Sequence, residues 1–102
     1  MEVTLFNDKI ISFNTINEFY DYEDFDKIKI CRIRTIKIEE FIKLPKDLEI
    51  LHCDKNQLKI LDNLPENLEK LYCFNNQLKT LDNLPKDLKY LYCENKRYSK
   101  FN

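Results

Sequence analysis

The sequence contains no glycine, no tryptophan and no alanine. The absence of glycine and alanine forces larger side chains at every position, and all three absences indicate an AT-rich genome because GC-rich codons encode the missing residues. No apolar run reaches seven residues, so a transmembrane span is not expected. Met1 is followed directly by Glu2, so no signal peptide is expected either. We therefore expect an intracellular, cytoplasmic protein whose four cysteines are reduced.

A strong charge of one sign is also missing, because the 102 residues carry a net charge of −1 and are 43% hydrophobic. This balance predicts one globular domain. Acidic residues concentrate in residues 1–27, with a cluster between Glu18 and Asp26. The cluster is either a solvated surface or a docking site for a basic partner. The remaining chain has scattered lysines rather than a concentrated basic patch, which disfavours nucleic-acid binding.

A repeat of 20 residues fills the C-terminal part of the chain. Leu44 to Asn63 reads LPKDLEILHCDKNQLKILDN, and Leu64 to Asn83 reads LPENLEKLYCFNNQLKTLDN. A third, degenerate copy begins LPKDLKYLYCEN at Leu84. A fixed short period predicts stacked supersecondary units that share one continuous core.

Each repeat is expected to hold one short strand. Leu71 and Cys73 alternate with Tyr72 and Phe74, which predicts a strand with one buried face. Twenty residues leave no room for a full helix, so the chain should return in an extended path or a tight turn, as the proline of each LP step favours. Stacked units of this kind form a parallel sheet on a concave face.

The stretches Leu48–Leu58 and Leu68–Leu78 resemble the leucine-rich repeat family through its LxxLxLxxNxL core. The short period and the LP step resemble the bacterial-effector type. The cysteine at the sixth position resembles repeat proteins of amoebal giant viruses. This resemblance implies a β-rich solenoid that offers a protein-binding surface, with a host protein as the partner and the host cytoplasm as the location if the source is viral.

The chain is expected to be one domain with three parts. Residues 1–27 form an N-terminal cap with an antiparallel hairpin turning at Asn7-Asp8, residues 28–43 form a degenerate repeat, and residues 44–102 form the repeats with a degenerate C-terminal cap. Thr15 and Glu18 fit a capping box for a helix through about Tyr22, although Asp21 to Asp26 could equally be an acidic loop. We expect about five parallel strands, one antiparallel N-terminal strand and little helix.

Several residues with reactive or polar side chains are predicted to be structural. The amides of Asn56 and Asn76 should hydrogen-bond backbone groups where each strand bends into the turn. Cys53, Cys73 and Cys93 form one inward column, where parallel Cβ vectors suit a disulfide poorly. There is no CxxC pair, and a straight column cannot surround a tetrahedral zinc ion. A metal site or a redox switch is the alternative to an inert core. No cofactor is expected.

The outward sheet face is the candidate site for binding a protein partner. One column reads Ile10, Ile30, Ile50, Lys70 and Tyr90, and the next reads Ser12, Arg32, His52, Tyr72 and Tyr92. Aromatic and arginine side chains are enriched in protein interfaces. The predicted binding residues are Arg32, Arg34, His52, Tyr72, Phe74, Tyr90 and Tyr92. The alternative is that the aromatic side chains only stabilise the sheet.

Enzymatic activity is not expected. His52 and Asp54 share a face and could form a general base, but no nucleophile joins them and a shallow sheet offers no enclosed pocket. A catalytic fragment related to ligase-bearing effectors is ranked last, because the chain outside the repeats is too short. The main alternative to a binding module is self-association, in which copies stack end to end through sheet edges at residues 2–6 and 91–94.

Overall fold

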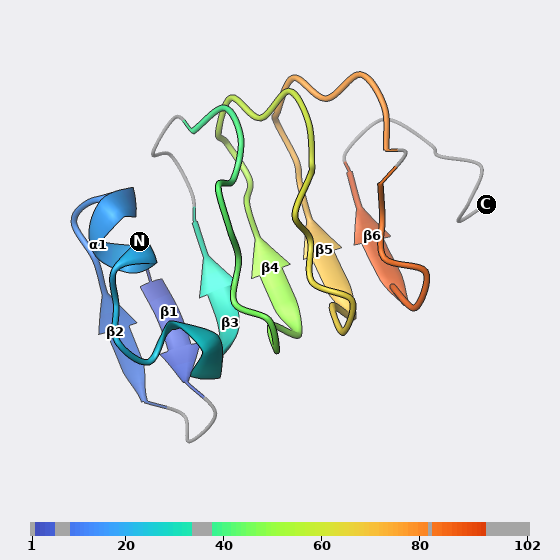
Figure 1. The fold of residues 1–102 in the computed structure, drawn as a ribbon. Coiled ribbons are helices and arrows are strands. Elements are labelled where there is room, and N and C mark those ends of the chain that lie inside the picture. Colours follow the sequence, from blue (N-terminus) through green and yellow to red (C-terminus); the bar gives the residue numbers. More distant parts are fainter. Residues whose placement is uncertain (1, 6–8, 34–37, 82, 94–102) are drawn as a thin grey trace.

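The computed structural model describes residues 2–5, 9–33, 38–81 and 83–93. A mixed six-stranded sheet dominates it, with the strand order β2-β1-β3-β4-β5-β6 (Figure 1). Arg34, the hairpin turn expected at Asn7-Asp8, and residues 94–102 of the expected degenerate C-terminal cap lie outside the described residues. The strands are β1 (Glu2–Leu5), β2 (Ile10–Ser12), β3 (Ile28–Arg32), β4 (Ile50–His52), β5 (Lys70–Tyr72) and β6 (Tyr90–Tyr92).

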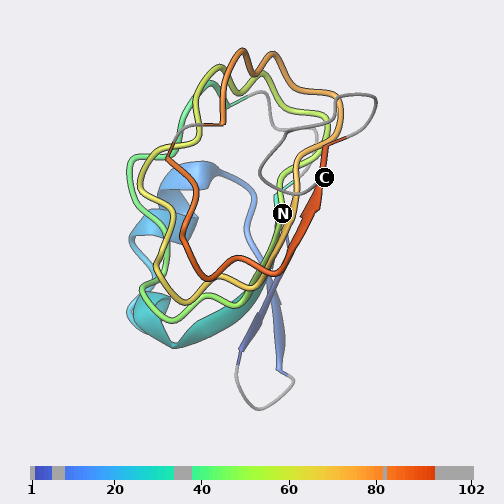
Figure 2. The same ribbon diagram turned by 90° about the vertical axis from the view of Figure 1, so that its right-hand side faces the viewer.

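The four strands β3 to β6 are parallel and pair with neighbours 20 residues apart. Ile30 pairs with Ile50, Ile50 with Lys70, and Lys70 with Tyr90. Figure 2 shows the strands on one side, with the connecting segments of successive units lying over one another. The repeat period therefore equals the strand spacing along the chain, and the result is a sheet-rich domain with four parallel strands and little helix.

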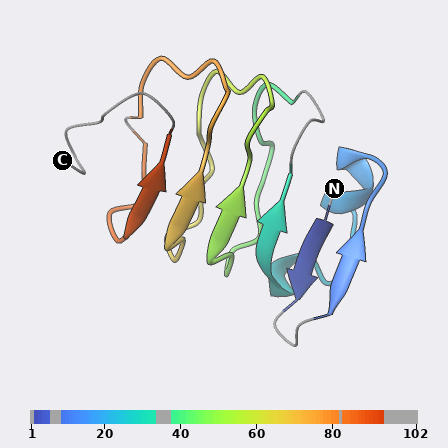
Figure 3. The same ribbon diagram turned by 180° about the vertical axis from the view of Figure 1, so that it is seen from behind.

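The N-terminal hairpin differs from the expected arrangement in one respect. β1 is antiparallel to both of its neighbours and lies between β2 and β3, as the view from behind also shows (Figure 3). The sequence-based alignment placed Ile10 directly beside Ile30, but Thr4 pairs with both. Hence four strands, not about five, form the continuous parallel part, since β2 is separated from β3 by β1.

The position of β1 between β2 and β3 also determines which strands form the edges of the sheet. Among the described strands, β2 and β6 are the outer ones, and β1 is paired on both sides. The prediction of a sheet edge at residues 2–6 is therefore wrong. The period predicts the face and direction of the residues around Ile10, but it does not predict which strand of a hairpin lies next to β3.

Helix α1 (Ile16–Tyr20) begins at the expected cap and ends earlier than predicted. The Thr15 Oγ1 atom accepts a hydrogen bond from the Glu18 N–H at 3.2 Å. The Glu18 carboxylate accepts one from the Asn14 N–H at 3.0 Å, one residue before the cap itself. The helix ends at Tyr20 rather than about Tyr22, and a 3-10 turn over Phe25–Lys27 follows in the acidic segment.

The N-terminal cap joins the repeats through a shared apolar core. Phe19 packs edge-on against Phe25 with ring centroids 5.0 Å apart, and the exposed fractions of their side chains are 0% and 7%. The Tyr20 hydroxyl accepts a hydrogen bond from the Ile42 N–H at 3.1 Å. The inward side chains of the repeats complete the core, notably Ile28, Cys31, Ile33, Leu48, Leu51, Leu68 and Leu71.

The LP steps and the residues with left-handed backbone form the turns between strands. The N–H groups of Leu48, Leu68 and Leu88 each donate to the carbonyl of the proline three residues earlier at 3.2 Å. Three described non-glycine residues have positive φ, namely Lys55 (58°), Asn63 (63°) and Asn75 (56°). In a chain without glycine, asparagine occupies two of these positions because its short polar side chain tolerates the left-handed region.

None of the helices in the described part of the chain is long and apolar enough to cross a membrane.

Candidate binding surface

The outward face of β4, β5 and β6 carries a continuous row of stacked rings. Within this row, His52 and Tyr72 have centroids 4.2 Å apart with planes 4° from parallel, and Tyr72 and Tyr92 are 4.6 Å apart at 8°. We call His52, Tyr72 and Tyr92 the aromatic ladder. The three residues pair directly across neighbouring strands, so the strand spacing of about 4.8 Å places successive rings within stacking distance.

A second row lies beside the aromatic ladder on the same face. Ile50, Lys70 and Tyr90 pair across β4 to β6, and the Lys70 Nζ atom lies 5.3 Å from the Tyr90 ring centroid. We call the six outward residues of β4 to β6 the tyrosine face: Ile50, His52, Lys70, Tyr72, Tyr90 and Tyr92. Its outer end is the most open part, because Tyr90 and Tyr92 are 48% and 39% exposed.

Two further predicted binding residues, Arg32 and Phe74, lie at the margins of this face. Arg32, on β3, is exposed and pairs in register with His52. Phe74, which follows β5, is half-buried, and its N–H donates to the Asp54 carboxylate at 3.0 Å. The sequence identified the ring-bearing positions, and stacking of aromatic side chains across neighbouring strands was the alternative to a binding role; the participation of His52 in that stacking was not predicted. The signal for Lys70 was its place in the outward column, although it was not among the predicted binding residues.

The His52 and Asp54 pair does not form an open acid–base site. Asp54 is only 9% exposed, and its Oδ1 atom accepts the Phe74 N–H. The His52 imidazole lies flat against Tyr72. The Asp54 carboxylate thus stabilises the backbone of the next unit, and the His52 ring stabilises the aromatic ladder.

Asn56 and Asn76 link neighbouring units through their amides. The Asn56 Nδ2 atom donates to the carbonyls of Ile33, Cys53 and Asp54 at 2.6, 3.1 and 3.2 Å. The Asn76 Nδ2 atom donates to three equivalent carbonyls, and its Oδ1 atom accepts the Leu58 N–H at 3.1 Å. Each amide therefore spans two consecutive units, which is a structural role.

The cysteine column is only partly as predicted. Cys31 and Cys53 are buried free thiols, and burial raises the pKa of both above the ordinary thiol value, with the Asp54 charge adding to the rise at Cys53. Cys73 and Cys93, however, are joined in a disulfide. The structure differs here from the prediction of reduced thiols, and the Cα separation of 5.0 Å lies within the range of about 4.4–6.8 Å typical of bridged cysteines.

No group of three or more potential metal ligands occurs among the described residues.

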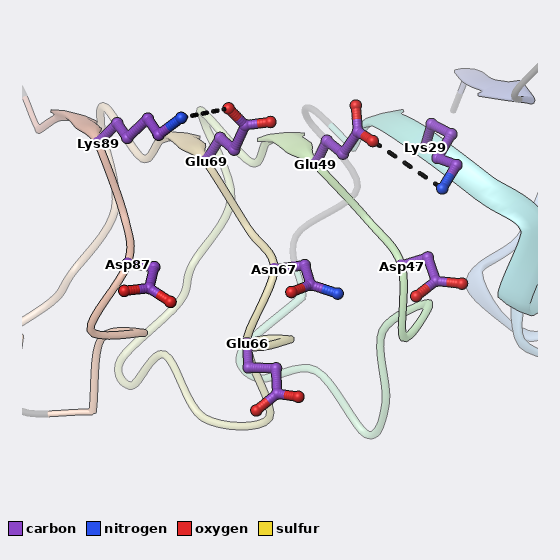
Figure 4. A pocket seen from close by; sticks show the side chains of 8 residues that line it. All are labelled: Lys29, Asp47, Glu49, Glu66, Asn67, Glu69, Asp87 and Lys89. Carbon is purple, nitrogen blue, oxygen red and sulfur yellow. Dashed lines mark hydrogen bonds and ion pairs between the residues drawn. The ribbon is translucent and has the colours of Figure 1, made fainter.

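A charged groove, not anticipated from the sequence, lies where the chain enters β4, β5 and β6 (Figure 4). Its volume is about 530 Å³, and the Glu69 carboxylate pairs with Lys89 at 3.2 Å while Glu49 pairs with Lys29 at 3.9 Å. The sequence does contain a pattern that could have predicted this groove, because the charged residues Lys29, Glu49, Glu69 and Lys89 recur every 20 positions. The groove is lined by Lys29, Asp47, Glu49, Glu66, Asn67, Glu69, Asp87 and Lys89.

The acidic N-terminal segment is partly engaged with its surroundings. The Asp26 Oδ1 atom accepts the Lys46 N–H at 3.2 Å, and Asp24 pairs with Lys27 at 3.5 Å. Asp26 thus links the cap to the first LP step rather than being purely solvated.

The chain matches no family model, no curated protein and no solved structure.

Proposed function

We propose that this chain is a short leucine-rich repeat solenoid that acts as a non-catalytic protein-interaction module. Two features support the solenoid. Consecutive parallel strands pair at a constant offset of 20 residues, and the amides of Asn56 and Asn76 connect successive units in the same way. The LxxLxCxxNxL pattern of the sequence fits this arrangement, since its leucines and cysteines are the inward residues.

The proposed binding site is the concave sheet face, with the tyrosine face at its centre and Arg32 and Phe74 at its margins. Arg34, which follows Arg32 by two positions in the sequence, is included in the proposal on the sequence pattern alone. One observation carries this proposal: the large side chains of Tyr90 and Tyr92 remain exposed, although the opposite face of β3, β4 and β5 is packed by the buried residues Cys31, Leu51 and Leu71. Tyrosine on a rigid strand offers a large contact area with few rotamers to immobilise, which is why tyrosine is frequent at binding hot spots.

The experiment is a pull-down from a lysate of the candidate host, with the wild-type chain beside a Tyr72→Ala/Phe74→Ala/Tyr92→Ala variant. A matched control removes exposed apolar side chains elsewhere, as Ile42→Ala/Ile60→Ala, where the wild-type residues are 72% and 43% exposed. Circular dichroism would verify that all three proteins are folded. We expect that some lysate proteins bind the wild type and the control variant but do not bind the Tyr72→Ala/Phe74→Ala/Tyr92→Ala variant.

Equal recovery on all three proteins would contradict a binding role for the sheet face. The rings would then serve only to stabilise the sheet, at about 0.2–1 kcal/mol per cross-strand pair.

The second candidate function is self-association through the outer strands of the sheet, which are β2 and β6 among the described strands. Ile10 on β2 is 63% exposed, and Tyr90 on β6 is 48% exposed, so both outer strands present apolar surface. Sedimentation velocity over a hundredfold concentration range would test it. A sedimentation coefficient that rises with concentration would support stacking, and a constant monomer value would exclude it.

A further inference from the structure

We infer that the partner segment that docks on the tyrosine face is acidic, with carboxylate side chains placed over Lys70 and the aromatic ladder. The inference rests on the proposed function and adds the chemistry of the partner. It follows from how the rings are oriented, from which polar groups they present and from the charges of the six residues concerned.

In the aromatic ladder, the facing sides of neighbouring rings cover one another. With separations of 4.2 and 4.6 Å, the space between His52, Tyr72 and Tyr92 admits no further ring. A partner approaching the sheet therefore meets ring edges and polar ring atoms. Nucleobases and sugars bind aromatic side chains through their faces, so this geometry disfavours stacking on the interior of the aromatic ladder.

Ring edges and tyrosine hydroxyls favour an oxygen-rich partner. The quadrupole of an aromatic ring is negative on its faces and positive at its edge. The phenol groups of Tyr72, Tyr90 and Tyr92 can each donate a hydrogen bond. Carboxylate oxygens are the strongest acceptors that a protein partner offers, because hydrogen bonds to a charged acceptor are about twice as strong as neutral ones.

The charge of the tyrosine face agrees with this preference. All six of its residues are described, and Lys70 is the one among them with a permanent charge, while none is acidic. Arg32 adds a second exposed cation next to His52. The nearby acids Glu49 and Glu69 lie off these two rows, in the charged groove, where each pairs with a lysine. Asp54 shares the face with His52, but it is only 9% exposed and its Oδ1 atom accepts the Phe74 N–H.

The test uses three fluorescein-labelled decapeptides that alternate leucine with glutamate, glutamine or lysine, and so differ only in charge. Fluorescence anisotropy with the full chain at low salt should rank their affinities as glutamate above glutamine above lysine. Raising the salt concentration should lower the affinity for the glutamate peptide more than for the other two peptides, since screening acts on charge pairs.

Variants locate the site. Lys70→Glu should lower the affinity for the glutamate peptide about tenfold, because it replaces an attraction by a repulsion at the docking surface. Lys70→Gln should weaken it less. The control Lys79→Glu makes the same change in net charge at an exposed lysine beside a different pocket, and it should leave the affinity within about twofold.

Three results would overturn the inference: equal affinity for all three peptides, a preference for the lysine peptide, or an equal loss with Lys79→Glu. Absence of binding by every peptide would count against it in the same way. The proposed function is separable from this outcome. If the lysine peptide binds best and Tyr72→Ala/Tyr92→Ala abolishes that binding, the face remains a binding site and only the assigned partner charge is wrong.

Discussion

The imidazole of His52 and the phenol ring of Tyr72 stack at 4.2 Å with their planes 4° from parallel. The two residues are direct partners on β4 and β5, 20 positions apart in the chain. The sheet spacing therefore sets the ring separation, and the packed core behind Leu51 and Leu71 holds the strands in register. A surface feature of the face is in this way a consequence of the repeat period.

The central ring of the aromatic ladder should contribute more to stability than the terminal one. Tyr72 stacks closely on both His52 and Tyr92, at 4.2 and 4.6 Å, whereas the second ring contact of Tyr92, with Tyr90, is longer at 6.3 Å. We expect Tyr72→Leu to lower the free energy of unfolding by about 1–3 kcal/mol and Tyr92→Leu by about half of that, at about 0.5–1.5 kcal/mol per aromatic pair. Urea denaturation measures both. Equal losses would show that the stacking contributes little.

The bridging amide of Asn56 should be essential for stability. Its two amide N–H groups are shared among three backbone carbonyls, and the residue is 6% exposed. Asn56→Ala should lower the free energy of unfolding by at least about 1–3 kcal/mol, the range for leaving a buried polar group unsatisfied. The control is Asn83→Ala, whose hydrogen bond to Asp62 is exposed and should be worth well under 1 kcal/mol. Thermal and urea denaturation that fail to separate the two variants would contradict the bridging role.

Much of the parallel sheet could be predicted from the sequence because the repeat carries redundant information. The strands β4, β5 and β6 fall at the alternating segments around Leu51, Leu71 and Leu91, and β3 falls one period earlier. The inward leucines follow from a period of two within each strand. The start of α1 follows from the local preference of Thr15 for the cap position.

The features that escaped prediction are relations between elements. A 20-residue shift correctly aligns Ile10 with Ile30 in one column, yet it cannot show that Thr4 lies between them. Likewise, the repeat predicts the inward cysteine column and its strand spacing, but the parallel Cβ vectors expected there argued against the pairing of Cys73 with Cys93. The stacking of His52 on Tyr72 depends on rotamers, which spacing alone does not reveal.

The backbone at Lys55 should be a site where stability can be gained. Lys55 has a φ of 58° and is the repeat equivalent of Asn75, which has a φ of 56°. A left-handed backbone is unfavourable for most side chains and easier for asparagine. We expect Lys55→Asn to raise the free energy of unfolding by about 0.5–1 kcal/mol. Its control is Lys79→Asn, at an exposed lysine outside the described positive-φ set, which should have no such effect in urea denaturation. A gain at both positions would point to charge rather than backbone conformation.

The four cysteines should differ in reactivity. Burial disfavours the thiolate and so raises the pKa of Cys31 and Cys53, which keeps both thiols protonated at neutral pH and hinders alkylation in the folded protein. Raising the pH to about 9 should therefore label neither while the fold is intact. In denaturant without reductant, mass spectrometry after iodoacetamide should find these two cysteines labelled, because Cys73 and Cys93 are joined. Reduction before labelling should raise the number of labelled cysteines to four. Four labelled cysteines without reductant would contradict the disulfide and restore the prediction of a fully reduced column.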